Sequence, residues 1–183
     1  MPILGIIASA ISGNLWQPDG AYDALATVTV PSGGLASIDF AGIPNTYKHL
    51  QVRYINTTST VNQNLIFRFN GDTGSNYAWH RLLGDGSSAI ADGVSATTGM
   101  SIGRSGGNTT SFAAGVVDIL DYTSTSKNKT VRTLYGTDQN GSGLIFLGSG
   151  LWFKTPEAVN TFTMTSAAGN FAQYSQFSLY GIR

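Results

Sequence analysis

Apolar and polar side chains alternate with a period of two along much of the chain, which predicts β-strands. Within residues 47–55, Leu50, Val52 and Tyr54 share one face of such a strand, and the polar residues between them share the other. No window longer than ten residues shows the apolar stripe of an amphipathic helix. The pattern therefore predicts an all-β chain.

Runs of strand-like composition recur along the chain, separated by clusters of Gly, Asn, Asp and Pro that favour turns. The predicted strands cover residues 25–30, 35–40, 47–55, 64–69, 77–83, 112–122, 130–135, 144–153, 161–165 and 173–182. The glycine-rich stretch 84–111 is expected to form a long surface loop with one short strand around residues 100–102. Strands joined by tight turns indicate an antiparallel β-sandwich of jelly-roll type, although the pattern by itself does not separate a sandwich from a barrel.

The N-terminal segment differs from the rest, because it is apolar and carries no charged side chain before Asp19. An exposed apolar segment lowers solubility, so it is a targeting peptide, a core strand or a docking arm. It lacks the positive leading region of a secretory signal, and its apolar run falls far short of the roughly 20 residues that cross a membrane. We expect residues 1–20 to form an extended docking arm, with a core strand as the alternative, and residues 21–183 to form a single β-sandwich domain. The candidate interface residues of the arm are its large apolar side chains Ile3, Leu4, Ile6, Ile7, Ile11, Leu15 and Trp16.

Composition narrows the classes of partner. Ten Lys and Arg balance ten Asp and Glu, and charged residues make up only 11% of the 183 residues, against about 25% in an average soluble domain. Without a basic excess, the release of counterions from a phosphate backbone gives little binding energy, which argues against nucleic acid as a partner. The chain has no cysteine, so stability must come from packing and, we expect, from subunit association.

Four segments spread over nearly the whole chain carry a resemblance to known proteins. They are residues 2–13, 43–53, 69–81 and 169–183. Together they resemble a group of short bacteriophage virion proteins, labelled tail fibre or minor structural protein. The resemblance implies a component of a phage particle with a β-sandwich body. It implies no catalytic motif, so no functional residue carries over from it.

This resemblance leads to an expectation about assembly. Fibres and decorations commonly pack around threefold axes, and homo-oligomers with closed symmetry are the ordinary outcome for shared apolar surfaces. We expect a non-enzymatic homotrimer in the virion, as a tail-fibre, head-fibre or decoration component, which docks to other virion proteins through its N-terminal arm. No cofactor, nucleic acid or membrane insertion is expected.

The densest polar turn, residues 69–77, is the first candidate for binding chemistry. Asn70, Asp72 and Asn76 supply oxygen atoms at spacings that faintly resemble a calcium loop. A calcium loop needs more carboxylates, including a bidentate acid near its end. The simpler interpretation is a hairpin whose Asn70-Gly71 pair adopts positive φ.

An alternative function is a carbohydrate-binding module that attaches a phage to its host. Asp72, Asn76, Tyr77 and Trp79 are the candidate glycan-binding residues, because aromatic rings stack on sugars and amide and carboxylate groups bond to hydroxyls. Large aromatic residues on one face of a strand more commonly pack in the core. The two interpretations differ in whether Tyr77 and Trp79 are exposed.

No catalytic or metal-binding constellation emerges from the sequence. The two histidines, His49 and His80, have no accompanying ligands at a spacing that suits zinc. Asp118 and Asp121 lie three residues apart on one predicted strand, which places them on opposite faces rather than as a cooperating pair. An enzyme is therefore not expected.

Overall fold

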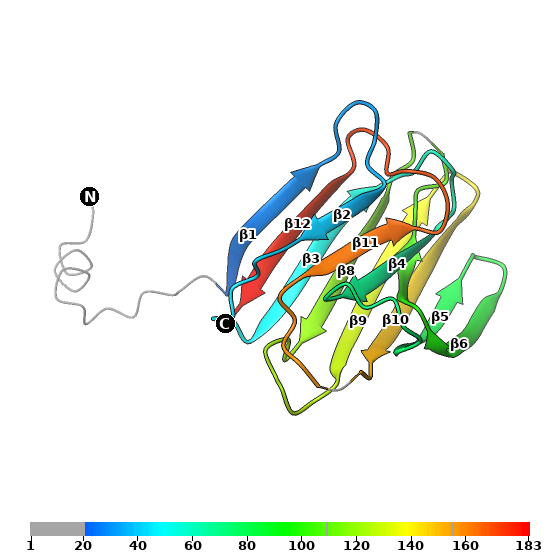
Figure 1. Cartoon of the computed structure of the whole chain (residues 1–183). Coiled ribbons are helices and arrows are strands. Elements are labelled where there is room, and N and C mark those ends of the chain that lie inside the picture. The colour runs from blue at the N-terminus through cyan, green and yellow to red at the C-terminus, as the bar shows by residue number, and fades with distance from the viewer. Residues whose placement is uncertain (1–20, 109, 155) are drawn as a thin grey trace, which may run out of the picture.

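The computed structural model describes residues 21–108, 110–154 and 156–183, and every regular element in them is a β-strand. The strands form two antiparallel sheets that lie face to face (Figure 1). In chain order they are β1 Tyr22–Thr29, β2 Ser37–Phe40, β3 His49–Asn56, β4 Asn64–Phe69, β5 Tyr77–Gly84, β6 Ala89–Thr97, β7 Met100–Arg104, β8 Ala113–Leu120, β9 Lys129–Asp138, β10 Gly143–Trp152, β11 Phe162–Ser166 and β12 Gln176–Ile182. The prediction of an all-β antiparallel sandwich is confirmed.

Eight of these strands are wound as a jelly roll. The large sheet contains β1-β12-β3-β8 as neighbours, and the small sheet is β2-β11-β4-β7. Among these eight strands alone, the first pairs with the last, the second with the seventh, the third with the sixth and the fourth with the fifth. This is the winding of a folded antiparallel ribbon that defines a jelly roll, so the jelly-roll expectation is also confirmed.

The other four strands extend the large sheet beyond β8. The hairpin β5–β6 is inserted between β4 and β7, and the hairpin β9–β10 is inserted between β8 and β11. In the large sheet they continue the order as β8-β9-β10-β5-β6, so that β1 and β6 form its two edges (Figure 1). We call strands β9, β10, β5 and β6 the extension.

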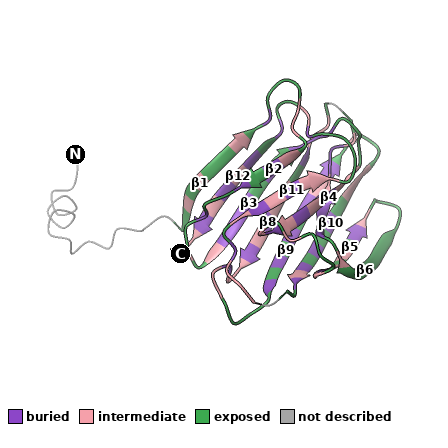
Figure 2. Ribbon diagram, viewed as in Figure 1, coloured by how far each residue is buried: buried purple, intermediate pink, exposed green. Residues whose placement is uncertain are grey.

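The hydrophobic core fills the space between the two sheets. The ring of Phe67 lies 5.0 Å from the ring of Phe69 and 4.9 Å from that of Phe162, measured between centroids. Leu50, Val52 and Tyr54 of β3 are buried, as the alternation predicted. Along the central strands, buried residues therefore alternate with more exposed ones (Figure 2).

One part of the strand prediction is wrong. Residues 89–97 form β6, within the stretch 84–111 that the sequence analysis assigned to a loop. All residues of β6 except Thr97 are exposed, so the strand has no buried face to impose an alternating pattern. It forms because a tight turn returns the chain beside β5, where the Asp85 carboxylate accepts hydrogen bonds from the backbone N–H groups of Ser87 and Ser88. The expected short strand around residues 100–102 is present as β7.

Candidate functional site

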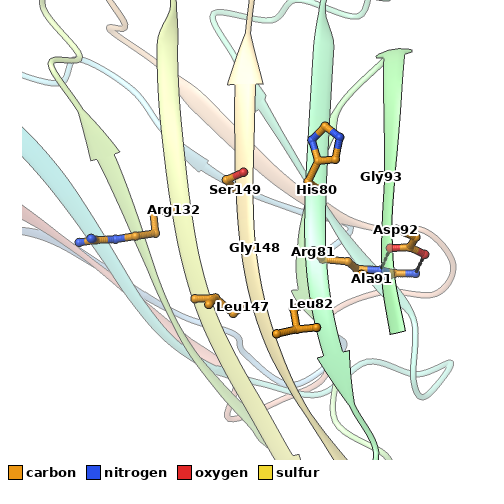
Figure 3. Close-up of a pocket in the computed structure, with 10 residues that line it drawn as sticks. All are labelled: His80, Arg81, Leu82, Ala91, Asp92, Gly93, Arg132, Leu147, Gly148 and Ser149. Atoms are coloured by element: carbon orange, nitrogen blue, oxygen red, sulfur yellow. Dashed lines mark hydrogen bonds and ion pairs between the residues drawn. The ribbon is translucent and has the colours of Figure 1, made fainter. Parts of the chain in front are cut away.

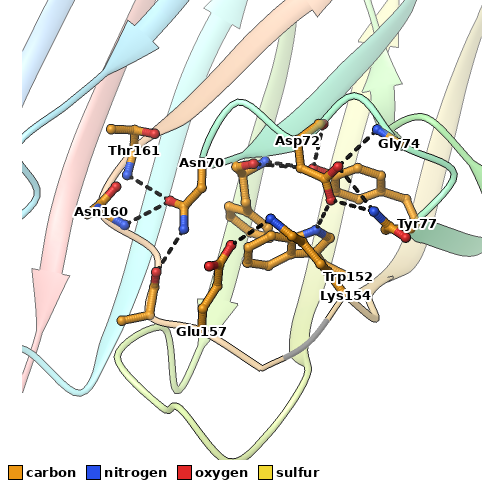
Figure 4. A network of polar contacts seen from close by, with 12 residues as sticks. Asn70, Asp72, Gly74, Tyr77, Trp152, Lys154, Glu157, Asn160 and Thr161 are labelled. Carbon is orange, nitrogen blue, oxygen red and sulfur yellow. Dashed lines mark hydrogen bonds and ion pairs between the residues drawn. The ribbon is translucent and has the colours of Figure 1, made fainter.

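The β4–β5 turn brings three of the predicted glycan-binding residues together: Asp72, Asn76 and Tyr77 (Figure 4). Asn70 and Gly71 both have positive φ, 48° and 67°, as predicted. The hairpin interpretation itself is wrong, because β4 lies in the small sheet and β5 in the large sheet, so this turn connects the two sheets instead of two paired strands. The seven candidate interface residues of the arm, from Ile3 to Trp16, lie outside the described residues.

Asn70 fastens this turn to a distant segment. Its Oδ1 atom accepts hydrogen bonds from the backbone N–H groups of Asn160 and Thr161, and its Nδ2 atom donates to the carbonyl oxygen of Ala158 (Figure 4). The amide oxygen that a calcium loop would direct at a metal ion is therefore engaged within the protein.

Asp72 is the centre of the turn. Its carboxylate accepts hydrogen bonds from the Trp152 indole N–H at 2.7 Å, from the Gly74 backbone N–H at 2.9 Å and from Asn76 Nδ2 at 3.0 Å. Burial acts to raise the pKa of Asp72, but these hydrogen bonds outweigh it and lower the pKa below its ordinary value. The carboxylate thus joins the turn to β10 as a structural acceptor.

Tyr77 belongs to the core. Its side chain is fully buried, and its ring stacks on that of Trp152 with centroids 6.3 Å apart and an interplanar angle of 16°. Its hydroxyl donates to the carbonyl oxygen of Asp72 at 3.0 Å, and burial raises the pKa of Tyr77 to about 12. The ring offers no face to a sugar, so the assignment of Tyr77 to a glycan site is corrected.

Trp79 does not join this group. It is partly buried on β5, and the Arg81 guanidinium lies over its ring, 5.1 Å from the centroid. Arg81 is in turn held by two hydrogen bonds to the Asp92 carboxylate. The fourth candidate residue therefore already has a cationic partner within the chain. Trp152, which the sequence analysis did not connect to Asp72, occupies the place at the turn that Trp79 was expected to take.

Asp118, Asp121 and His49 form contacts that do not combine into one catalytic or metal-binding group. Asp118 accepts from Gln51 and Arg132, whereas Asp121 pairs with Lys127. Among the described residues, no three His, Asp or Glu side chains gather as a metal-ion site would require. His49 Nδ1 accepts a hydrogen bond from the backbone N–H of Asp121, which is a structural contact.

The outer face of the extension, which points away from the small sheet, carries exposed large apolar side chains. Leu134, Leu147 and Leu82 face one another across β9, β10 and β5, and each is 51–53% exposed. Ile145, two residues before Leu147 on β10, is 61% exposed. We call these four residues the apolar half of the outer face. Soluble monomers rarely leave such side chains contiguous and uncovered.

A shallow hollow of about 650 Å³ adjoins the apolar half (Figure 3). Leu82 and Leu147 form part of its lining, and His80, Arg132 and Ser149 lie along it. The His80 ring lies against the backbone of β6 at Gly93, where an added Cβ would come within 2.4 Å of it. Glycine at this position allows the ring to approach the edge strand closely.

The same outer face is polar on the other side of β8. The Arg53 guanidinium lies 4.9 Å from the ring centroid of Tyr22 and 5.1 Å from that of Tyr180. Arg53 also donates to Gln51, and Gln51 donates to Asp118. We call these five residues the polar half. Their charged and aromatic groups contact one another within the chain.

No family model matches this chain, and no curated protein is similar to it in sequence. The part of the chain that the structure describes contains no apolar helix of membrane-spanning length. The surface of the described residues is therefore the source of evidence about function. The apolar half is the candidate functional site, since it is the feature that a free monomer would least tolerate.

The apolar half left a trace in the sequence. Residues 144–147 read Leu-Ile-Phe-Leu, without the polar residues of a half-exposed strand. Such a continuous run is typical of strands covered on both faces. Phe146 is fully buried in the core, whereas Ile145 and Leu147 face outward. The sequence thus carried a signal for a second covering layer, which the sequence analysis did not identify.

Proposed function

We propose that this protein is a non-enzymatic structural component of a bacteriophage virion. It assembles as a homotrimer, serves as a tail-fibre, head-fibre or decoration component, and docks to other virion proteins through residues 1–20. The observation that carries the proposal is the apolar half of the outer face. A jelly roll is a frequent scaffold of viral capsid domains, and the resemblance to short phage virion proteins supports the same assignment.

The energetics favour a shared apolar surface. Full burial of one Leu or Ile side chain contributes about 1.5–3 kcal/mol. Leu82, Leu134, Ile145 and Leu147 are 51–61% exposed, so covering them contributes about half of this value for each residue and offsets part of the 4–15 kcal/mol that association costs. The four residues lie on three neighbouring paired strands, so they are held rigidly and need little ordering on binding.

The alternative function, a carbohydrate-binding module for host attachment, has less support. Of its two aromatic candidates, Tyr77 is buried and Trp79 is stacked with Arg81. The Asp72 carboxylate accepts three hydrogen bonds from within the chain. A glycan site would have to use other residues.

The mass of the full chain in solution, measured by light scattering over a range of concentrations, tests the assembly. The expected result is a trimer for the natural chain and a smaller species for Leu147→Lys. A matched control is Tyr174→Lys, because Tyr174 is 71% exposed but lies outside the outer face; this variant remains trimeric. A natural chain that is monomeric at every concentration overturns the proposal.

The location is tested on particles of the phage that encodes the chain. Quantitative peptide mass spectrometry of purified particles is expected to find the protein in a fixed copy number, in multiples of three. Its absence from purified particles overturns the virion assignment, even if the protein trimerises in solution.

A further inference from the structure

Strand β6 is an unusually open edge of the large sheet. It is nine residues long, and all of them except Thr97 are exposed. Within the described part of the chain, only β5 pairs with it. Its one charged side chain, Asp92, is already bound by Arg81 at 2.6 Å. The backbone N–H and C=O groups on its outer side are therefore free to pair with another strand.

Natural proteins usually protect such an edge with lysines, prolines or bulges. Residues 89–97 contain neither lysine nor proline, and the one positive φ, at Ala96, lies next to the end of the strand. The pairing of each edge strand has one irregularity, between Ala24 and Ala26 in β1 and between Val94 and Thr97 in β6. Each edge strand also carries one ion pair, Asp23–Arg183 or Asp92–Arg81. The two edges differ in the surface beside them, because β6 adjoins the apolar half and β1 belongs to the polar half.

The surroundings of the β6 edge are apolar on both faces of the sheet. Ile90 lies opposite Leu83 on the inner side and is 46% exposed. Ala91 lies opposite Leu82 on the outer side, where it continues the apolar half. A strand added at this edge would therefore contact apolar groups with both of its faces. Strands buried on both faces have continuous apolar runs rather than alternating ones.

Residues 3–11 have this composition. They read Ile-Leu-Gly-Ile-Ile-Ala-Ser-Ala-Ile, without a charged or strongly polar side chain. Their length of nine residues equals that of β6. A run that is apolar at almost every position suits an edge that needs covering on both sides.

The length of the connecting chain decides which copy supplies these residues. β1 and β6 are separated by seven strand spacings in the large sheet, so a strand added beyond β6 lies about 38 Å from β1 at about 4.8 Å per spacing. From Ile11 to Tyr22 the chain has eleven peptide steps, which span at most about 36–40 Å when fully extended. To reach β6 of its own chain, the connecting segment would have to be fully extended and run straight across the whole sheet. The edge of a neighbouring copy requires no such path.

We propose that residues 3–11 of one copy add as a strand to β6 of a neighbouring copy. This inference rests on the proposed homo-oligomer and names its contact: an exchange of arms that lengthens the large sheet and broadens the apolar half. It assigns residues 3–11 to contact between copies, so that docking to other virion proteins falls to the rest of residues 1–20. Because the donated segment and the accepting edge are different surfaces, the contact is head-to-tail, and it closes into a ring of three copies when the rotation between them is threefold.

Disulfide trapping tests the proposal in the full chain, which has no cysteine of its own. Three single variants, Ile3→Cys, Ile7→Cys and Ile11→Cys, are each mixed with the single variant Val94→Cys and oxidised. At least one mixture is expected to give a disulfide-linked dimer of two different chains. The matched control is Thr27→Cys on the opposite edge strand β1, where an exposed residue of similar size gives no cross-link with the same arm variants.

An edge variant provides a second readout. Ile90→Lys puts a charge on a residue that is 46% exposed, so circular dichroism is expected to show an intact fold, while association weakens about tenfold or more. Val61→Lys, at an exposed apolar residue outside the sheets, is the control that leaves association unchanged.

The outcomes separate this inference from the proposed function. A trimer that gives no cross-link to β6, or that cross-links equally well to β1, overturns the arm exchange and leaves the assembly in place. Cross-linking only within single chains of a double variant Ile7→Cys, Val94→Cys also overturns it. A monomeric natural chain overturns both.

Discussion

The two halves of the outer face of the large sheet belong to one continuous surface but differ in how their side chains are satisfied. In the polar half, Arg53 lies over the rings of Tyr22 and Tyr180 and joins a hydrogen-bonded chain through Gln51 to Asp118. In the apolar half, three leucines and one isoleucine are more than half exposed. The polar half satisfies itself within one chain, whereas the apolar half gains only when another surface covers it.

This contrast follows the construction of the sheet. The polar half lies on strands of the jelly roll proper, and the apolar half lies on the inserted strands of the extension. The extension contributes to the same core as the jelly roll through Tyr135, Phe146 and Trp152, and its outer face adds the surface that we propose for association. Substitutions on the outer face of the extension are therefore expected to change mainly the association of copies. Substitutions elsewhere are expected to change mainly the free energy of unfolding.

The double variant Leu82→Lys, Leu134→Lys is expected to have the largest effect, because it places two charges in the apolar half. The substitutions remove two half-exposed leucines, each worth about half of the 1.5–3 kcal/mol of full burial, and place two unpaired charges in the shared surface, so association is expected to weaken by about 100-fold or more. Both residues are 53% exposed in one copy, so monomer stability changes by only about 0.5 kcal/mol. Sedimentation velocity and urea unfolding measure the two effects. An unaltered oligomer would show that another surface mediates assembly.

Asp72→Ala tests how much the hydrogen bond between the β4–β5 turn and Trp152 of β10 contributes to stability. The substitution leaves the buried indole N–H of Trp152 without its acceptor, and a buried unsatisfied donor together with the lost charged hydrogen bonds costs about 2–3 kcal/mol. The free energy of unfolding from denaturant titration gives the value. Asp85→Ala is the control, because Asp85 accepts backbone hydrogen bonds in an exposed turn without a tryptophan partner. Equal losses in the two variants would contradict the role of Trp152.

Arg53→Met tests whether the contacts of the polar half stabilise the single chain and play no part in association. It keeps much of the apolar stem but removes the cation from Tyr22 and Tyr180. Exposed cation–π contacts are worth about 0.5–1 kcal/mol each, so the expected loss of stability is about 1–2 kcal/mol. The oligomeric mass stays unchanged. A shift of this variant toward monomer would place the polar half in the interface as well.

The smallest expected effect is on how the free energy of unfolding falls at acidic pH, where the Asp72 carboxylate becomes protonated. The folded-state pKa of Asp72 is lowered from 3.8 because hydrogen bonds from Trp152, Asn76 and Gly74 outweigh burial. The unfolded chain therefore binds this proton more readily, and the stabilisation is complete above the unfolded pKa and is lost as the pH falls through the folded value. Denaturant titrations between neutral and acidic pH are expected to show a shallower acid decline for Asp72→Asn. An identical decline would contradict the assignment.

Much of the sandwich could be predicted, because a strand with one buried face has apolar and polar residues in alternation. Leu50, Val52 and Tyr54 alternate with polar residues, and the Asn70-Gly71 pair marks a tight turn with two positive φ angles. That this turn connects the two sheets and does not form a hairpin depends on the pairing of β4 and β5 with other strands. Strand β6 escaped the prediction since neither of its faces is buried. Its position depends on pairing with β5, which no local pattern encodes.

The candidate site was predicted less well than the fold. The sequence placed Asp72, Asn76 and Tyr77 together in a turn, but it could not show that Trp152, 80 residues from Asp72, donates to the Asp72 carboxylate. Nor could it show that the Tyr77 ring lies inside the sandwich. Aromatic residues read alike in a core and in a sugar site, because both environments favour large flat rings.

Local periodicity and composition are enough to predict the all-β class, the tight turns and the apolar character of residues 3–11. Which apolar residues stay uncovered depends instead on contacts between strands that are distant in the sequence. Leu82, Leu134 and Leu147 come from three separate strands and meet because the pairing register of β9, β10 and β5 places them in one row. Register is a long-range property, fixed by how the whole sheet packs, and it turned three ordinary strand positions into one continuous apolar surface.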